Sequence, residues 1–110
     1  MTPLTTRDEV DEVLRQDGAI LYKHSTRCPI SAMANEHMQR FEQEHPDAPV
    51  YLIDVNESTE ASRYVAERTG VEHQSPQVIL LRDGGVAWHA DRFDIQPEAL
   101  EEHLAGGAGR

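Results

Sequence analysis

The chain has 110 residues, the size of a single domain. Its 20 acidic residues against 10 lysines and arginines give a net charge of −10 with neutral histidines, which argues against binding to nucleic acid or to anionic lipid. Its single cysteine excludes an intramolecular disulfide framework and a cysteine-based zinc cluster, and its longest strongly apolar run, Val78 to Leu81, is too short for a membrane span.

The first predicted elements are a helix and a strand. The stretch Thr6-Arg7-Asp8-Glu9 has the S/T-x-x-E form of a capping box, which marks the start of a helix. Apolar residues then recur at helical spacing, at Val10, Val13 and Leu14, before Gly18 ends the helix. The short apolar run from Ala19 to Tyr22 predicts a buried strand.

A second helix is predicted to begin next to the cysteine. A loop over Lys23 to Arg27 leads to Cys28-Pro29, and proline suits the first position of a helix because its missing N–H has no helical partner there. The helix should end before His45-Pro46. Its apolar stripe is expected at spacings of three and four, at Ile30, Met33, Ala34, His37, Met38 and Phe41.

The next predicted elements are a strand over 50–55 and a helix from Ser58 or Thr59 to Gly70. Two strands, over 78–81 and 86–90, then flank a tight turn at Asp83-Gly84-Gly85. The last predicted helix runs from Pro97 through Leu104. The order α-β-α-β-α-β-β-α makes the first two strands parallel and the last two antiparallel. We therefore expect an α/β fold with a four-stranded mixed sheet and helices on both faces. Residues 1–105 should form one domain, and residues 106–110 a flexible Gly-rich tail.

The cysteine is predicted to lie where a thiolate is favoured. The first N–H groups of a helix are unpaired, and the helix dipole places partial positive charge there, so both lower the pKa of a thiol at that position. No acidic residue occurs over 18–35 or over 73–82, although the chain is rich in acids. These observations favour a reactive Cys28, and the alternative is a small buried hydrophobic residue.

Polar residues near Cys28 are candidates for the same site. Lys23, His24 and Arg27 lie in the first acid-free window and could meet a ligand or influence the thiol. Ser31 stands three residues after the cysteine, where a C-x-x-C pair would have its second thiol. A hydroxyl can donate a hydrogen bond to a thiolate, but it cannot resolve a mixed disulfide, so an outside thiol would be needed.

A second group of residues precedes the third predicted strand, at His73-Gln74-Ser75-Pro76-Gln77. Pro76 is by default a trans proline at the start of a strand. With this order of elements and a cysteine at a helix start, a cis proline also becomes credible. It would leave the backbone groups of Ser75 free to pair with an extended substrate.

Together these segments resemble the thioredoxin superfamily and, within it, the monothiol bacilliredoxins of the YtxJ type. The residues that carry the resemblance are Lys23-His24-Ser25-Thr26-Arg27-Cys28-Pro29-Ile30-Ser31, His73-Gln74-Ser75-Pro76-Gln77-Val78 and the hairpin from Asp83 to Ala90. The likeness extends from about Thr6 to Leu104, nearly the whole chain. C-P-x-S alone is weak because monothiol glutaredoxins share it, whereas T-R-C-P-I-S followed by S-P-Q is specific.

The resemblance implies a thioredoxin-like fold in which Cys28 is the nucleophile and Pro76 is cis. It implies bacillithiol as co-substrate, bacillithiolated client proteins as partners, an NADPH-dependent bacillithiol disulfide reductase as an indirect partner, and a location in the bacterial cytoplasm. The expected catalytic residues are Cys28, Ser31 and Pro76. The expected ligand contacts are Lys23, His24, Thr26, Arg27, Pro29 and Ser75.

Two other functions remain open from the sequence. A dimeric iron–sulfur carrier of the monothiol glutaredoxin type would use one protein cysteine and one small thiol from each subunit. A non-catalytic thioredoxin-like adaptor would carry an inert Cys28. We expect no tightly bound cofactor and no metal site, because the six histidines show no pair four residues apart, and no secretion signal, because no apolar stretch follows the N-terminus.

Overall fold

The computed structural model describes residues 1–27 and 29–108; Cys28 and the last two residues lie outside the described residues. Its strands are β1 (Thr2–Pro3), β2 (Ile20–His24), β3 (Val50–Asp54), β4 (Gln77–Arg82) and β5 (Gly85–Asp91). Its helices are α1 (Arg7–Leu14), α2 (Pro29–Glu44), α3 (Thr59–Thr69) and α4 (Pro97–Ala108), with a short 3₁₀ helix η1 (Arg92–Asp94) after β5.

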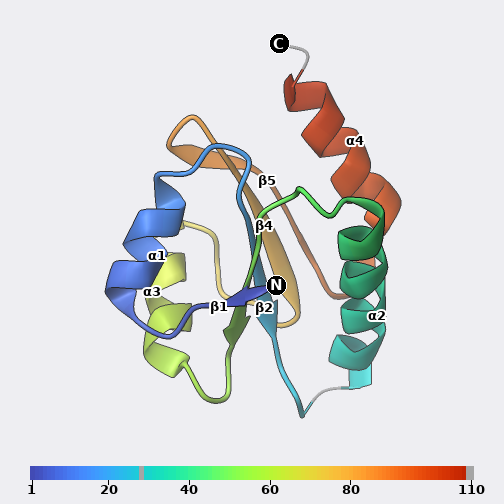
Figure 1. The fold of residues 1–110 in the computed structure, drawn as a ribbon. Coiled ribbons are helices and arrows are strands. Elements are labelled where there is room, and N and C mark those ends of the chain that lie inside the picture. Colours follow the sequence, from blue (N-terminus) through green and yellow to red (C-terminus); the bar gives the residue numbers. More distant parts are fainter. Residues whose placement is uncertain (28, 109–110) are drawn as a thin grey trace.

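The strands form one mixed sheet in the order β1-β3-β2-β4-β5. Strands β1, β3 and β2 run parallel to one another, while β4 is antiparallel to both β2 and β5. Helices α1 and α3 cover one face of the sheet, and α2 and α4 cover the other (Figure 1). The predicted α/β layers and strand directions are therefore confirmed.

The expected number of strands is wrong, because the sheet has five strands and the order begins with β1. Thr2 and Pro3 pair with Tyr51 and Leu52 of β3. Two residues cannot show the alternation of apolar and polar residues by which a strand is recognised in a sequence. The extended conformation of Thr2 and Pro3 is recognised from their pairing with β3.

The predicted start of α1, both predicted limits of α2 and the predicted end of α3 agree well with the structure. Thr6 caps α1 through a complete capping box, in which its hydroxyl accepts from the Glu9 N–H at 3.2 Å and the Glu9 carboxylate accepts from the Thr6 N–H at 3.1 Å. Helix α2 begins at Pro29 and ends at Glu44, directly before His45-Pro46. Gly70 ends α3 in the left-handed conformation, with φ of 76°.

Several predicted strand ends differ from the structure by one residue, and two elements extend further than predicted. Strand β2 continues to His24, so Lys23 and His24 belong to the strand and not to the following loop. Helix α4 continues to Ala108 and includes the first part of the segment expected as a tail. Each glycine weakens a helix by about 1 kcal/mol, but extending a helix that is already packed is far easier than starting one.

The sheet separates two hydrophobic cores. One contains Leu21, Ile53 and Ile79 with the inner faces of α1 and α3, and the other contains Tyr22, Val78 and Leu80 with those of α2 and α4. Alternate residues of β2 therefore face different cores. Among the described residues, no helix has the length and the apolar character needed to cross a membrane.

Candidate functional site

Three segments meet at one edge of the sheet, where β2 ends and β4 begins. Lys23 of β2 is the partner of Gln77 of β4, and Gln77 is the partner of Asp91 at the end of β5. This register brings the loop after β2, the loop before β4 and η1 to the same edge. Two of the three segments that carry the family resemblance have residues at this edge, Lys23 to Arg27 and His73 to Val78. Cys28 follows Arg27 in the chain but lies outside the described residues.

The first turn of α2 has the composition that an anionic sulfur requires. It contains no acidic residue. Ser31 is fully buried, and its Oγ has no hydrogen-bond partner among the described residues. A buried hydroxyl that makes no hydrogen bond costs free energy, and its proton is available for donation. Pro29, the first residue of the helix, is exposed.

The loop after β2 is held by Asn56, for which no sequence motif predicts a role at this site. The Oδ1 of Asn56, just after β3, accepts a hydrogen bond from the Ser25 hydroxyl at 3.0 Å and from the Thr26 N–H at 3.2 Å. The Ser25 hydroxyl in turn accepts from the Arg27 N–H at 3.3 Å. The backbone is thus fixed, while the side chains of Thr26 and Arg27 are exposed and face solvent.

The loop before β4 contains a cis peptide bond between Ser75 and Pro76, the isomer that the resemblance implied. Pro76 is buried, and its carbonyl accepts a hydrogen bond from the Arg92 N–H at 2.9 Å. The Oγ of Ser75 is also buried without a partner among the described residues. This loop and η1 are therefore tied together.

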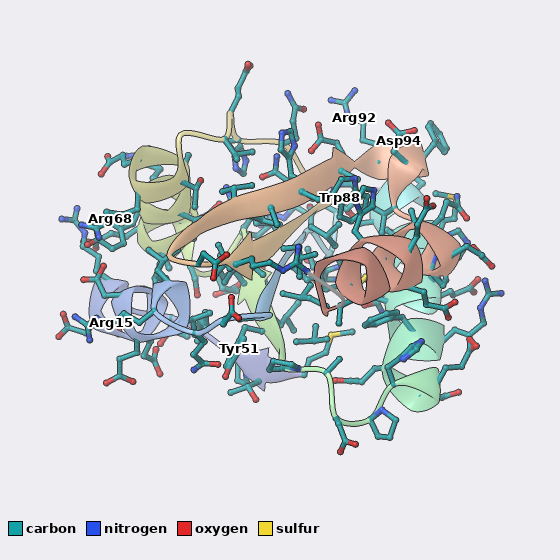
Figure 2. The ribbon with its side chains drawn as sticks, turned by 90° about the horizontal axis from the view of Figure 1, so that it is seen from above. Arg15, Tyr51, Arg68, Trp88, Arg92 and Asp94 are labelled. Carbon is teal, nitrogen blue, oxygen red and sulfur yellow. The ribbon has the colours of Figure 1, made fainter. Side chains whose placement is uncertain are left out.

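A shallow cavity of about 410 Å³ lies beside this loop and is lined by Gln74, Asp91, Arg92, Phe93 and Asp94. Arg92 has a φ of 52°, a left-handed conformation that is costly for a residue with a Cβ. Its guanidinium donates to the Gln74 side chain at 3.2 Å. Figure 2 shows Arg92 and Asp94 together at this end of the molecule, far from Arg15 and Arg68.

His24, the last residue of β2, is partly exposed. Its Nδ1 lies 3.1 Å from the hydroxyl of the buried Tyr22, which also donates to the Asn35 side chain at 3.4 Å. Burial lowers the pKa of His24, and the nearby Asp54 carboxylate opposes that shift. His24 is therefore favoured as a neutral imidazole at the end of β2.

Lys23 is fully buried, so the structure does not place it where it could contact a ligand from solvent. Its Nζ lies 3.1 Å from Nδ1 of His73, in the loop before β4. Burial lowers the pKa of Lys23 to about 8, and the Asp91 carboxylate opposes the shift. Gln77, also fully buried, donates to Asp91 at 2.9 Å and to the Glu72 carbonyl at 2.9 Å.

The fold places carboxylates near segments that are acid-free in the sequence. Asp54 is the partner of His24 across β2 and β3, and Asp91 is the partner of Gln77 across β4 and β5. Each lies beside a basic residue, because Asp54 affects the pKa of His24 and Asp91 that of Lys23. The sequence windows therefore understate the negative charge at this edge.

The depressed pKa of Lys23 predicts a pH-dependent stability. Between about pH 8 and about pH 10 the unfolded chain holds a proton on Lys23 that the folded protein has released, so the free energy of unfolding should rise with pH. The rise attributable to Lys23 is at most about 1.4 kcal/mol per pH unit. Urea denaturation across this range should show a steeper rise for the wild type than for Lys23→Met, and parallel curves would contradict the prediction.

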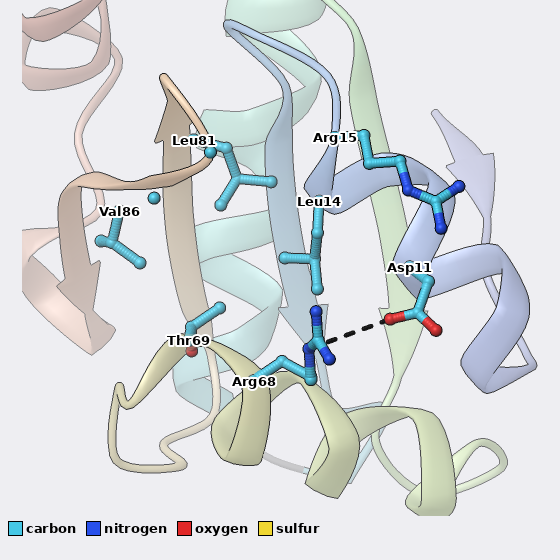
Figure 3. A pocket seen from close by; sticks show the side chains of 9 residues that line it. Asp11, Leu14, Arg15, Arg68, Thr69, Leu81 and Val86 are labelled. Atoms are coloured by element: carbon cyan, nitrogen blue, oxygen red, sulfur yellow. Dashed lines mark ion pairs between the residues drawn. The ribbon is translucent and has the colours of Figure 1, made fainter.

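A second cavity, of about 380 Å³, lies at the opposite end of β2, between the ends of α1 and α3 and the β4–β5 hairpin (Figure 3). Arg68 lies 3.9 Å from Asp11 at its rim, and Arg15 caps the end of α1. Cations at helix C-termini are stabilised by the helix dipole, which accounts for both arginines. In the described part of the chain, no cluster of three or more potential ligands could hold a metal ion.

Comparison with known sequences indicates a redox family. A family model described as monothiol bacilliredoxin BrxC matches residues 2–100. Bacilliredoxin BH2759 of Halalkalibacterium halodurans is 29% identical over 97 residues, which cover 84% of this chain and 66% of that protein. Bacilliredoxin ABC2448 of Shouchella clausii is 30% identical over 99 residues, with coverage of 86% and 69%. The chain thus spans about two thirds of the length of these curated relatives.

Comparison with solved structures agrees on the fold. A protein described as a candidate oxidoreductase with a thioredoxin fold superposes with a TM-score of 0.84 and 31% sequence identity. The match covers 93% of this chain and 91% of that chain. The thioredoxin-like fold expected from the resemblance is therefore confirmed, with the fifth strand as the correction.

Proposed function

The chain belongs to the monothiol bacilliredoxin family, and on that premise we propose that it is a thiol–disulfide oxidoreductase that removes bacillithiol from protein mixed disulfides through Cys28. Family membership and the thioredoxin fold support the redox role. The structural observation that most supports this proposal is that α2 begins at Pro29, the residue after Cys28. The first turn of that helix contains no carboxylate. The proposed setting is the bacterial cytoplasm, where bacillithiol is the small thiol.

In the first proposed step, the Cys28 thiolate attacks the bacillithiol sulfur of a client mixed disulfide. The bond between that sulfur and the client sulfur breaks, and the client leaves as a thiolate, which is the reduced form. Cys28 now carries bacillithiol in a new disulfide. Unpaired N–H groups at the start of a helix favour the attacking thiolate. The buried Ser31 hydroxyl, which has no partner among residues 1–27 and 29–108, is suited to donate to it.

In the second proposed step, an outside thiol regenerates Cys28. A second bacillithiol thiolate attacks the bacillithiol sulfur of the adduct, so that bacillithiol disulfide forms and Cys28 leaves as the thiolate. Ser31 stands where a resolving cysteine would be and cannot form a disulfide. An NADPH-dependent bacillithiol disulfide reductase would then return both bacillithiol molecules to the thiol form.

The exposed residues around the site are suited to hold these ligands. Bacillithiol carries carboxylates on its malyl group, and the exposed Arg27 guanidinium can pair with one of them. Thr26, Pro29 and His24 border the same edge of the sheet. Ser75, before the cis proline, offers its backbone to an extended client segment.

Intact mass measurement tests this proposal on the unmodified full chain. Exposure to bacillithiol disulfide should add the mass of one bacillithiol less two hydrogen atoms, and free bacillithiol should then remove it. The same treatment of Cys28→Ser should add nothing, which serves as the matched control. An unmodified wild-type protein, or an adduct that free bacillithiol leaves in place, would contradict the proposed cycle.

A further inference from the structure

A buried cation lies directly behind an exposed histidine at the edge of the proposed site. Lys23 has no exposed surface, and its Nζ is 3.1 Å from Nδ1 of His73. An ammonium group has donors and no acceptor, so Nδ1 of His73 must accept the hydrogen bond. The Ser62 hydroxyl, 3.3 Å from the same nitrogen, is compatible with this direction. In neutral His73 the proton therefore lies on Nε2.

The charge environment keeps His73 neutral. Desolvation lowers its pKa, and the Lys23 ammonium lowers it further. Asp91 of β5 opposes the fall in the pKa of Lys23, and its carboxylate accepts from Gln77 at 2.9 Å. Glu72 precedes His73 in the chain and is exposed. Asp91 is thus partly engaged by Gln77. The Lys23 ammonium can polarise the His73 imidazole, which makes the Nε2–H group a stronger hydrogen-bond donor.

The location of His73 places this pair at the edge of the proposed site. His73 is exposed and stands two residues before Ser75 and the cis proline. Lys23 and Gln77 are partners in the antiparallel pair of β2 and β4, so His73 lies at the edge to which the loop after β2 also belongs. The buried Lys23 cannot contact a ligand from solvent directly, and its charge would act through His73.

We propose that His73 is a specificity-determining residue of the site, that its Nε2–H donates a hydrogen bond to a carboxylate of the small thiol, and that Lys23 is the positioning residue that sets its tautomer. The ligand class is a thiol or disulfide with a carboxylate remote from its sulfur. This inference rests on the proposed function for the identity of that ligand. It gives Lys23 an indirect role in place of the direct contact expected from the sequence.

Steady-state kinetics test the contact. The substrates are a bacillithiolated peptide and the same peptide with methyl esters on the malyl carboxylates. With the acid substrate, His73→Ala should raise KM about ten-fold at unchanged kcat, and His73→Gln, which retains an N–H donor, should recover most of the loss. With the ester, the wild type should already show the raised KM, and His73→Ala should add nothing.

Nuclear magnetic resonance tests the positioning by Lys23 without any turnover. In the wild type, His73 should show the Nε2–H tautomer and a pKa below the ordinary value. In Lys23→Met its pKa should rise, because the neighbouring ammonium is gone. A thermal unfolding curve shows whether Lys23→Met is folded. If it is unfolded, the tautomer of His73 in the wild type and the KM values of the two His73 variants still test the inference.

Three results would overturn the inference. They are a proton on Nδ1 of neutral His73, an equal effect of His73→Ala on the acid and the ester, and an unchanged KM in His73→Ala. Failure of the proposed function is distinguishable, because the wild type would then turn over neither substrate. In that case the shift of the His73 resonances on adding bacillithiol, and its absence with the ester, would still report the contact.

Discussion

Replacing Cys28 with serine is expected to reduce client release to the rate of spontaneous exchange with free bacillithiol. A serine hydroxyl is essentially un-ionised near neutral pH, and it cannot form a disulfide with the bacillithiol sulfur. Because the chain has one cysteine, no second thiol can substitute for it. The measurement is the appearance of client thiol from a bacillithiolated protein, with wild type and Cys28→Ser compared at equal concentration.

The control for this experiment is the folded state of the variant. Cysteine and serine are similar in size, so Cys28→Ser should unfold in urea near the wild-type midpoint. Equal release by the two proteins would remove Cys28 from the mechanism and favour the inert cysteine of an adaptor. A coloured, dimeric wild-type protein with four thiolate ligands to a cluster would favour the iron–sulfur carrier instead.

The largest loss of stability is expected from Phe41→Ala. Phe41 is fully buried in the core between the sheet and α2, and its ring stacks on His45 with a centroid distance of 4.8 Å. Removal of a buried phenylalanine ring costs about 3–5 kcal/mol, because the protein loses both burial and contacts around the cavity that remains. Urea denaturation should show this loss as a lower midpoint at a similar slope.

The chain offers a matched control in its other phenylalanine. Phe93 is 63% exposed, so Phe93→Ala should change the free energy of unfolding by no more than about 0.5 kcal/mol. Because both variants replace phenylalanine with alanine, a difference in their free energies of unfolding reports the effect of burial. Similar losses for the two variants would mean that Phe41 does not carry the core contact that its burial indicates.

Much of the fold was predictable because local signals agreed with the tertiary structure. The capping box at Thr6, the proline at the start of α2 and the glycine at the end of α3 each act within one turn of chain. Such signals depend on backbone groups that are unpaired in any helix. The directions of the strands followed from the connections between them.

The residues around the site were less predictable because their roles depend on contacts across the sheet. Lys23 was expected in a loop, since a lysine rarely lies in a buried strand. Its buried position depends on partners from other elements, namely the His73 imidazole and the nearby Asp91 carboxylate. Asn56 holds the loop after β2 from a distance of 30 residues. No signal near either residue in the sequence indicates these partners.

Strand β2 serves two separate cores at once, with Leu21 in one and Tyr22 in the other. Substitutions in clusters without shared neighbours generally add in their effects on stability. Substitutions deep in one core should therefore add to those in the other in their effects on the free energy of unfolding. The layer of α1 and α3 is not independent of the proposed site, however, because the Ser62 hydroxyl of α3 lies 3.3 Å from Nδ1 of His73.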